Sequence, residues 1–167
     1  MENEAKMESN SIQNQSKKHE FPFDHWEYNN ALSNNETSKD NAKEVADALI
    51  SAEFDGQSGH GLSRVPSYVE QLSSGKVNGS VRPKIISSKG SVIRIDAGYG
   101  FAFPAISLAL REITKTSKKF GIAAVSISRS HHFGQAGRHV EQLAEHGLIG
   151  LMFGNTPKAI PPWGGTH

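Results

Sequence analysis

Hydrophobic residues first recur with a regular period after residue 41, and there the period is that of a helix. Two stretches place apolar side chains at positions i, i+3, i+4 and i+7, which is one face of an amphipathic helix. Ser63 stands before the second stretch as a candidate N-cap, and Gly75 follows it as a candidate end. The pattern predicts two amphipathic helices. Their apolar positions are Ala42, Val45, Ala46, Leu49 and Ile50 in the first, and Val65, Tyr68, Val69 and Leu72 in the second.

The pattern changes after residue 84, where short apolar runs alternate with longer helical stretches. Residues 85–86 and 92–95 flank a Ser-Lys-Gly turn and predict two short strands. Residues 101–120 and 135–146 have helical spacing, whereas residues 122–127 (IAAVSI) and 148–153 (LIGLMF) are nearly all apolar and predict buried strands. The order β-β-α-β-α-β after two helices predicts a mixed α/β fold class.

The two ends of the chain differ from this middle part. Residues 1–20 hold only four apolar side chains, too few to offset chain entropy, and they predict a disordered tail. Residues 155–167 form a Pro- and Gly-rich loop with no further element, as expected of a chain truncated at its C-terminus. We therefore divide the chain into a polar tail (1–20), a helical region (21–80) and a partial α/β domain (81–167).

Composition removes several classes of protein. Among 167 residues, 18 Lys and Arg balance 17 Asp and Glu, so the chain lacks the basic excess of a nucleic-acid surface. No Cys is present, which excludes disulfides, Cys-ligated metals and a thiol nucleophile. The chain has no apolar stretch of membrane-spanning length and no secretory signal, so we expect a cytoplasmic protein that binds neither membrane nor nucleic acid.

A first candidate site lies in residues 58–64, which read SGHGLSR. If Ser63 caps the following helix, Arg64 and Tyr68 lie one turn apart on one side, and His60 lies just before them. A helix start and an Arg guanidinium both favour an anion, and the guanidinium matches a carboxylate bidentately. The alternative is a glycine turn leading into an ordinary helix with a solvated Arg.

A second candidate site follows the strand predicted at residues 122–127, where His131 and His132 precede a helix. Ligands of α/β proteins often bind at such strand ends, and a His there can exchange protons near neutral pH. The alternatives are a solvated His pair, a structural cap, or a metal site with His139. The metal interpretation lacks a carboxylate at helical spacing, and we predict no metal.

Two glycine-containing segments complete the search for sites. Residues 154–157 (GNTP), with residues 163–165 following, could hold a ligand through backbone and small polar groups, or could simply turn. Residues 98–100 begin a G-x-G pattern, but its third glycine position is Phe103, so a Rossmann fingerprint is rejected.

Taken in order, these segments resemble the malate/L-lactate dehydrogenase family of the non-Rossmann type, which includes ureidoglycolate and sulfolactate dehydrogenases and a cyclic-imine reductase. The resemblance covers residues 42–165. Its motifs are SGHGLSRVPSYVEQL at 58–72, SHHFGQAG at 130–137, GLIG at 147–150, GNTP at 154–157 and PWGG at 162–165.

The resemblance implies an NAD- or NADP-dependent oxidoreductase that acts on a small 2-oxo or 2-hydroxy acid, and a homodimer. It implies His132 as the proton donor and acceptor, and His60, Arg64 and Tyr68 as residues facing the substrate, with Arg64 paired to its carboxylate. It implies Asn155 and Thr156 beside the cofactor.

The sequence departs from the family in three ways. The family's D-S-H-G is Ser58-Gly59-His60-Gly61 here, which removes an acidic neighbour of His60. The family's usual Asn before the catalytic His is His131, whose charge would perturb the pKa of His132. Family members are about twice as long. The alternative function is therefore a truncated, catalytically inactive remnant.

Overall fold

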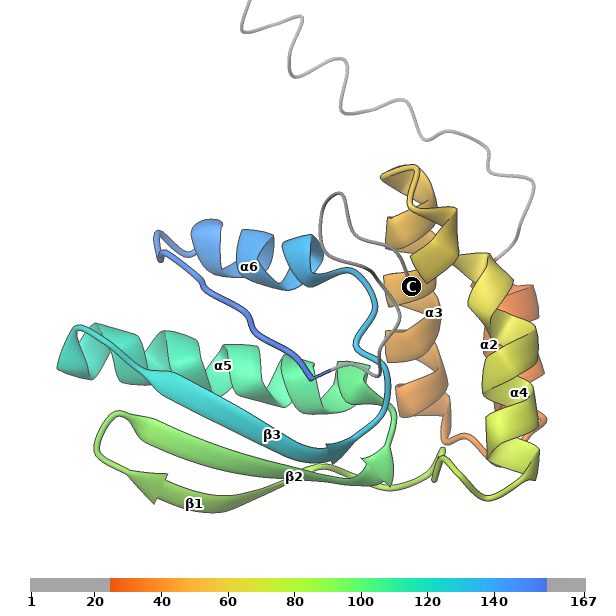
Figure 1. Ribbon diagram of the computed structural model, residues 1–167, viewed down its shortest axis with the longest axis horizontal. Coiled ribbons are helices and arrows are strands. Elements are labelled where there is room, and N and C mark those ends of the chain that lie inside the picture. The colour runs from red at the N-terminus through yellow and green to blue at the C-terminus, as the bar shows by residue number, and fades with distance from the viewer. Residues whose placement is uncertain (1–24, 156–167) are drawn as a thin grey trace, which may run out of the picture.

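The computed structural model describes residues 25–155 (Figure 1). The tail predicted at residues 1–20 lies outside this range. The helices are α2 (His25–Ser33), α3 (Lys39–Phe54), α4 (Val65–Ser73), α5 (Ala102–Phe120) and α6 (Ala136–Ala144), with 3-10 turns η1 (Ser58–His60) and η2 (Leu62–Arg64) before α4. The strands are β1 (Lys84–Lys89), β2 (Val92–Gly100) and β3 (Ala124–Ser130). The predicted mixed α/β class is confirmed.

Helices α2, α3 and α4 pack together beside the sheet (Figure 1). The predicted apolar face of α3 is buried, from Ala42 to Ile50. It meets Leu32 of α2 and Tyr68 and Leu72 of α4 in one core cluster. Phe101 and Phe103, at the start of α5, belong to the same cluster and join the helical part to the α/β part.

The sheet has the order β1-β2-β3, with β1 antiparallel and β3 parallel to β2. Central strand β2 buries Ile93, Ile95 and Ala97 against Ala105 and Ala109 of α5. Helix α5 ends at Gly121, whose φ of 78° is the left-handed conformation that glycine adopts without steric cost. Helix α6 lies against α5. The result places the ends of β2 and β3 next to the N-terminal helices.

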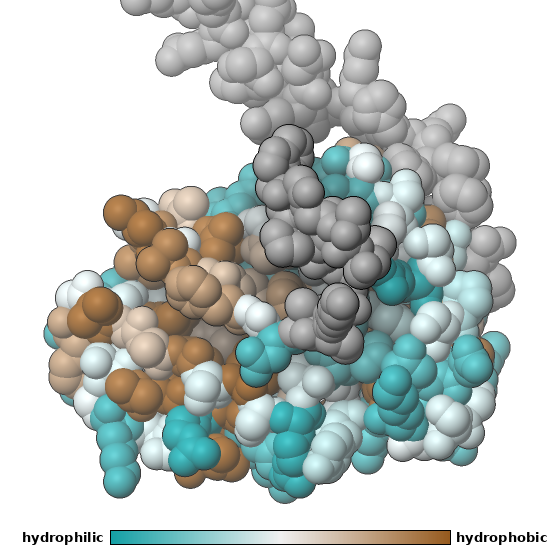
Figure 2. All heavy atoms as spheres, viewed as in Figure 1, coloured by the Kyte–Doolittle hydropathy of each residue, from teal (hydrophilic) through white to brown (hydrophobic). Residues whose placement is uncertain are grey.

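Two strand predictions need correction. β3 forms, but over residues 124–130, and it is only partly buried because it is an edge strand within the described residues. Residues 148–153, predicted as a buried strand, form none, and Ile149 (98%), Leu151 (81%) and Phe153 (88%) are exposed. An apolar run becomes a buried strand only when a neighbouring strand satisfies its backbone groups. Figure 2 shows hydrophobic side chains gathered where α5, α6 and β3 lie in Figure 1.

The predicted cap of α4 is also wrong. Ser63 lies inside η2, and its hydroxyl donates to the carbonyl of Ser58 at 2.5 Å instead of capping α4. The N-cap of α4 is Arg64, which makes no side-chain cap bond. The two short turns replace a conventional helix start because residues 58–64 fold back on themselves.

A buried amide ties α3 to the segment that enters the sheet. The Nδ2 group of Asn41 donates to the carbonyls of Gly79, at 2.8 Å, and Val81, at 2.9 Å. Asn41 is 5% exposed. The carbonyl of Gly79 also accepts from the Ser38 N–H at 3.4 Å, whereas the carbonyl of Val81 has only Asn41 as a partner among the described residues.

We expect Asn41→Ala to lower the free energy of unfolding by about 2 kcal/mol, because it removes two buried hydrogen bonds and leaves the Val81 carbonyl without a donor. Asp40→Ala is the matched control. Asp40 is 84% exposed and lies 3.5 Å from Arg82, so its loss should cost less than about 1 kcal/mol. Urea unfolding followed by circular dichroism measures both, and equal losses would contradict the role of Asn41.

Candidate active site

Two segments more than 60 residues apart in the sequence meet at one end of the sheet. The Tyr68 hydroxyl of α4 lies 3.0 Å from Nδ1 of His132, in the loop between β3 and α6. The His60 ring stacks on the His132 ring with 5.4 Å between centroids and 15° between planes. The structure thus brings together His60, Tyr68 and His132 from the two clusters that the sequence singled out.

The parallel pairing of β2 and β3 creates this meeting point. Both strands end at the same edge of the sheet, and the His131 N–H donates to the carbonyl of Gly100 at 3.1 Å. The register shifts between Asp96 and Gly100. Tyr99 (φ 62°) and Arg129 (φ 52°), one on each strand, adopt the left-handed conformation there. Such residues cost about 1 kcal/mol or more each, so packing must hold both strand ends in place.

The protonation states follow from burial. Tyr68 is 2% exposed, and burial raises the pKa of its hydroxyl to about 12, so it stays protonated. Burial, and then repulsion from Arg64 and from His60, lower the pKa of His132 below its ordinary value, which favours the neutral imidazole. His132 Nδ1 is the only partner of the Tyr68 hydroxyl among the described residues, so Tyr68 donates to it. His132 therefore carries its hydrogen on Nε2, which has no partner within residues 25–155.

Arg64 supplies a cation without a counter-ion. Its Nε donates to the carbonyl of Gly59 at 2.5 Å, and it forms no ion pair within the described part of the chain. Its two terminal nitrogens are therefore available to a carboxylate, which matches the planar guanidinium.

Sequence reasoning missed Glu53, which shapes this segment. One carboxylate oxygen of Glu53 accepts from the Leu62 N–H at 2.7 Å and the other from the Ser58 hydroxyl at 3.1 Å. A Cβ at Gly61 would overlap that carboxylate, so only glycine allows this packing. Since Glu53 belongs to α3 and no motif contains it, sequence spacing carried no signal for this contact.

The loop that bears His132 has further attachments that the sequence did not predict. His131 Nε2 lies 2.6 Å from Oε1 of Gln71, on α4. Gln135 donates to the Asp55 carboxylate at 2.5 Å, and His139 Nε2 donates to the carbonyl of Phe133 at 2.9 Å. Within residues 25–155, no group of three His, Asp or Glu side chains could hold a metal ion.

The predicted cofactor residues are only partly described. Asn155 is exposed and makes no hydrogen bond to the His132 group, and Thr156 lies outside the described residues, as do Pro157 and residues 163–165. Gly154, just before Asn155, lies against the Phe133 ring so closely that a Cβ would overlap it. Asn155 is thereby held near the loop that carries His132.

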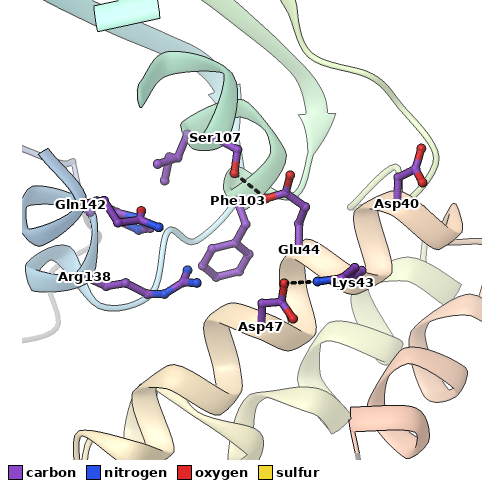
Figure 3. Close-up of a pocket in the computed structure, with 10 residues that line it drawn as sticks. Asp40, Lys43, Glu44, Asp47, Phe103, Ser107, Arg138 and Gln142 are labelled. Carbon is purple, nitrogen blue, oxygen red and sulfur yellow. Dashed lines mark hydrogen bonds and ion pairs between the residues drawn. The ribbon is translucent and has the colours of Figure 1, made fainter. Parts of the chain in front are cut away.

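A separate cavity of about 550 Å³ lies between α3, α5 and α6 (Figure 3). None of the predicted site residues lines it. Its polar groups largely pair with one another: the Ser107 hydroxyl donates to Glu44, and Lys43 pairs with Asp47 at 2.6 Å (Figure 3). Although it is well formed, this cavity is distinct from the His132 group.

A family model of malate/L-lactate dehydrogenases matches residues 25–167. The chain belongs to the malate/L-lactate dehydrogenase family. The family recognised in the sequence motifs is therefore confirmed. Relatives in this family include hydroxy-acid dehydrogenases, such as a malate dehydrogenase of Pyrococcus abyssi.

Two curated members of the malate/L-lactate dehydrogenase family illustrate the similarity. The (2R)-3-sulfolactate dehydrogenase (NADP(+)) of Chromohalobacter salexigens is 48% identical over 124 residues, which are 74% of this chain and 37% of that protein. The delta(1)-pyrroline-2-carboxylate/delta(1)-piperideine-2-carboxylate reductase of Pseudomonas putida is 37% identical over 74% of this chain and 36% of that protein. The chain thus spans slightly more than a third of their length.

Solved structures of the family share the fold. Delta1-piperideine-2-carboxylate reductase of Pseudomonas syringae superposes with a TM-score of 0.69 at 33% identity, over 72% of this chain and 36% of that one. Malate dehydrogenase of Pyrococcus horikoshii superposes with a TM-score of 0.69 at 29% identity, over 74% of this chain and 35% of that one. The malate/L-lactate dehydrogenase fold assignment therefore rests on both sequence and structure.

We expect Arg64→Gln to raise the pKa of His132, because it removes the stronger of the two cations that disfavour the protonated ring. NMR titration of the His132 ring measures the change. Arg82→Gln, which removes an exposed cation on the segment before β1, is the control and should leave the titration unchanged. A His132 pKa equal to wild type in both variants would contradict the assigned effect of Arg64.

We also expect the folded chain to lose stability in acid. Burial, followed by the His132 and Lys76 charges, lowers the pKa of His131 to about 4, and burial lowers those of His132 and His139. Since an unfolded His titrates near 6.5, the unfolded chain binds more protons between these values. The stabilisation is complete above about pH 6.5 and is lost as pH falls towards 4. His131 contributes on the order of 2 kcal/mol to this loss in the free energy of unfolding.

Urea unfolding at pH 7.5 and 4.5 measures this loss. His131→Gln should reduce the difference in the free energy of unfolding between pH 7.5 and pH 4.5, because the variant has no imidazole to protonate at that position. His146→Gln, at an exposed position after α6, should leave it unchanged. A difference unaffected by His131→Gln would contradict the assignment.

Proposed function

We propose that this chain supplies the proton-transfer and substrate-carboxylate groups of an oxidoreductase that moves a hydride between NAD(P) and a small 2-oxo or 2-hydroxy acid. The observation that carries the proposal is the 3.0 Å bond between Tyr68 and His132 Nδ1, on a ring that stacks on His60 and feels the charge of Arg64. Membership of a family with malate and sulfolactate dehydrogenases supports the reaction class.

The substrate class follows from the charges of the site. Among residues 25–155, the charged and titratable groups that act on His132 are Arg64 and a second imidazole, His60, and none of them is a carboxylate. Such a site favours an anion, and the unpaired terminal nitrogens of Arg64 match a carboxylate. A 2-oxo acid bound there would present its carbonyl oxygen to His132 Nε2.

Proton transfer then involves His132 and Tyr68. In reduction, a His132 protonated on both nitrogens donates from Nε2 to the oxygen as it gains charge, and the ring is left with its hydrogen on Nδ1. Oxidation is the reverse: the ring in its Nδ1–H form accepts the hydroxyl proton at a bare Nε2. The Tyr68 hydroxyl suits both states, because it donates to a bare Nδ1 and accepts from a protonated one. When bound, the nicotinamide ring would supply or accept the hydride.

One described residue, Asn155, supports a nicotinamide group beside this site. Asn155, held near Phe133 by the close packing of Gly154, offers an amide that both donates and accepts, as a carboxamide requires. We assign Asn155 and, with it, Thr156 to the cofactor. The cofactor is NAD or NADP.

Family membership also supports a homodimer and a cytoplasmic location, which we include in the proposal. In the part of the chain that the structure describes, no helix is long and apolar enough to cross a membrane. Sedimentation of the purified protein tests the dimer.

The function is tested by titrating NADH and NADPH into the purified chain with fluorescence detection, followed by turnover with a panel of 2-oxo acids. We expect saturable binding of one cofactor and reduction of at least one acid. His132→Gln should lower turnover by about 100-fold or more while cofactor binding persists, because it removes the proton donor. His146→Gln is the matched control. A folded chain that binds neither cofactor would favour a catalytically inactive remnant instead.

A further inference from the structure

Two consecutive histidines contact the same helix. His132 bonds to Tyr68, and His131 bonds through Nε2 to Oε1 of Gln71, three residues further along α4 and on the same face. The mechanism proposed above uses His132 and Tyr68 but gives no role to His131, although this residue is partly buried and fully bonded on its Nε2 side.

The hydrogen-bond network determines which nitrogen of His131 carries hydrogen. Gln71 Nε2 donates to the Ser67 hydroxyl at 2.9 Å, so the Oε1 of Gln71 faces His131 and can only accept. His131 must therefore donate from Nε2. Its Nδ1, buried without a partner, is then a bare nitrogen, and the ring is neutral.

The His131 ring also completes an aromatic cluster. Its ring centroid lies 5.1 Å from that of Tyr68, with 74° between the ring planes, and 5.6 Å from that of Phe101, with 82° between the planes. The ring centroids of Tyr68 and Phe101 lie 5.3 Å apart. Perpendicular contacts at these distances are favourable and orient the rings. Tyr68 and Phe101 are each 2% exposed, so the His131 ring packs on two buried side chains.

The charges around the two histidines explain why a neutral ring matters. Lys76 and His132 act on His131, and Arg64 and His60 act on His132. Neither ring has a carboxylate among the groups that shift its pKa in the described part of the chain. A positive charge on His131 would therefore add to cations that already disfavour protonation of His132.

We propose that His131 is a positioning residue that acts through Tyr68: its neutral ring, held by Gln71, orients the Tyr68 hydroxyl onto His132 Nδ1 and so determines which nitrogen of His132 faces the substrate. The catalytic meaning of this role rests on the proposed function. The positioning itself is a property of the chain alone and is measured without substrate or cofactor.

The test is nitrogen-detected NMR of the histidine rings in the purified chain. In the wild type we expect both His131 and His132 in the Nε2–H form, with His131 still neutral at pH 5.5. A His131 that carries its hydrogen on Nδ1, or that protonates near pH 6.5, overturns the proposal.

Two variants separate positioning from simple packing. His131→Asn removes the ring, and we expect His132 to become a mixture of both forms with a pKa closer to its ordinary value. His131→Phe keeps the ring contacts but loses the bond to Gln71, so we expect the fraction of His132 in the Nε2–H form to lie between those of the wild type and His131→Asn. His146→Asn, outside the site, should leave His132 as in the wild type. If His131→Asn folds and leaves the hydrogen position and pKa of His132 unchanged, the proposal is wrong.

Failure of this proposal and failure of the proposed function give different results. Should His131→Asn not fold, the wild-type spectrum and His131→Phe still decide the matter. A chain with the expected NMR behaviour that binds no cofactor overturns the function and leaves the positioning role standing. If the chain turns over substrate but His131→Asn leaves the NMR behaviour of His132 unchanged, the positioning role is wrong and the proposed function stands.

Discussion

The attachment of the loop after β3 to helix α4 is the contact on which the candidate site depends. Neither element could form the site alone, because α4 carries Tyr68 and the loop carries His132. Hydrogen bonds from His131 to Gly100 and to Gln71 fix the loop between the sheet and the helix. The helical part and the α/β part share a hydrophobic core through Phe101, and this packing stabilises the attachment.

The same arrangement sets the electrostatic character of the site. Buried polar groups in it are neutral, and its charge comes from Arg64, which stays ionised at any physiological pH. A site with a permanent cation and a neutral His132 ring attracts an anion without holding a proton permanently. This is the balance that the proposed reversible proton exchange would require.

Much of the fold was predictable from the sequence, for reasons that particular elements make clear. The apolar face of α3 has a strict helical period, and a period is a local property of the sequence. Residues 148–153 have an equally clear apolar run, but a strand also needs a partner, and the described residues offer none. The cap at Ser63 failed because residues 58–64 bond to one another in two short turns.

The residues of the candidate site differ in the same way: some could be predicted from local sequence and others could not. His60, Arg64, Tyr68 and His132 were predicted because they stand in motifs. Glu53 and Gln71 were not, because their roles arise from contacts that no spacing encodes. The sequence indicates His131 as one of a histidine pair and as a departure from the family, but not its role, because its hydrogen-bond partner Gln71 is 60 residues away.

The hydrogen bond from Arg64 Nε to the carbonyl of Gly59 has a consequence for how tightly the site can bind an anion. A solvated arginine loses about 2 kcal/mol of side-chain conformational freedom when it becomes fixed on a ligand. Here much of that freedom is lost when residues 58–64 fold, before any anion arrives. The guanidinium is therefore preorganised, so a carboxylate meets a receptor that needs little rearrangement, and more of the contact energy remains as affinity.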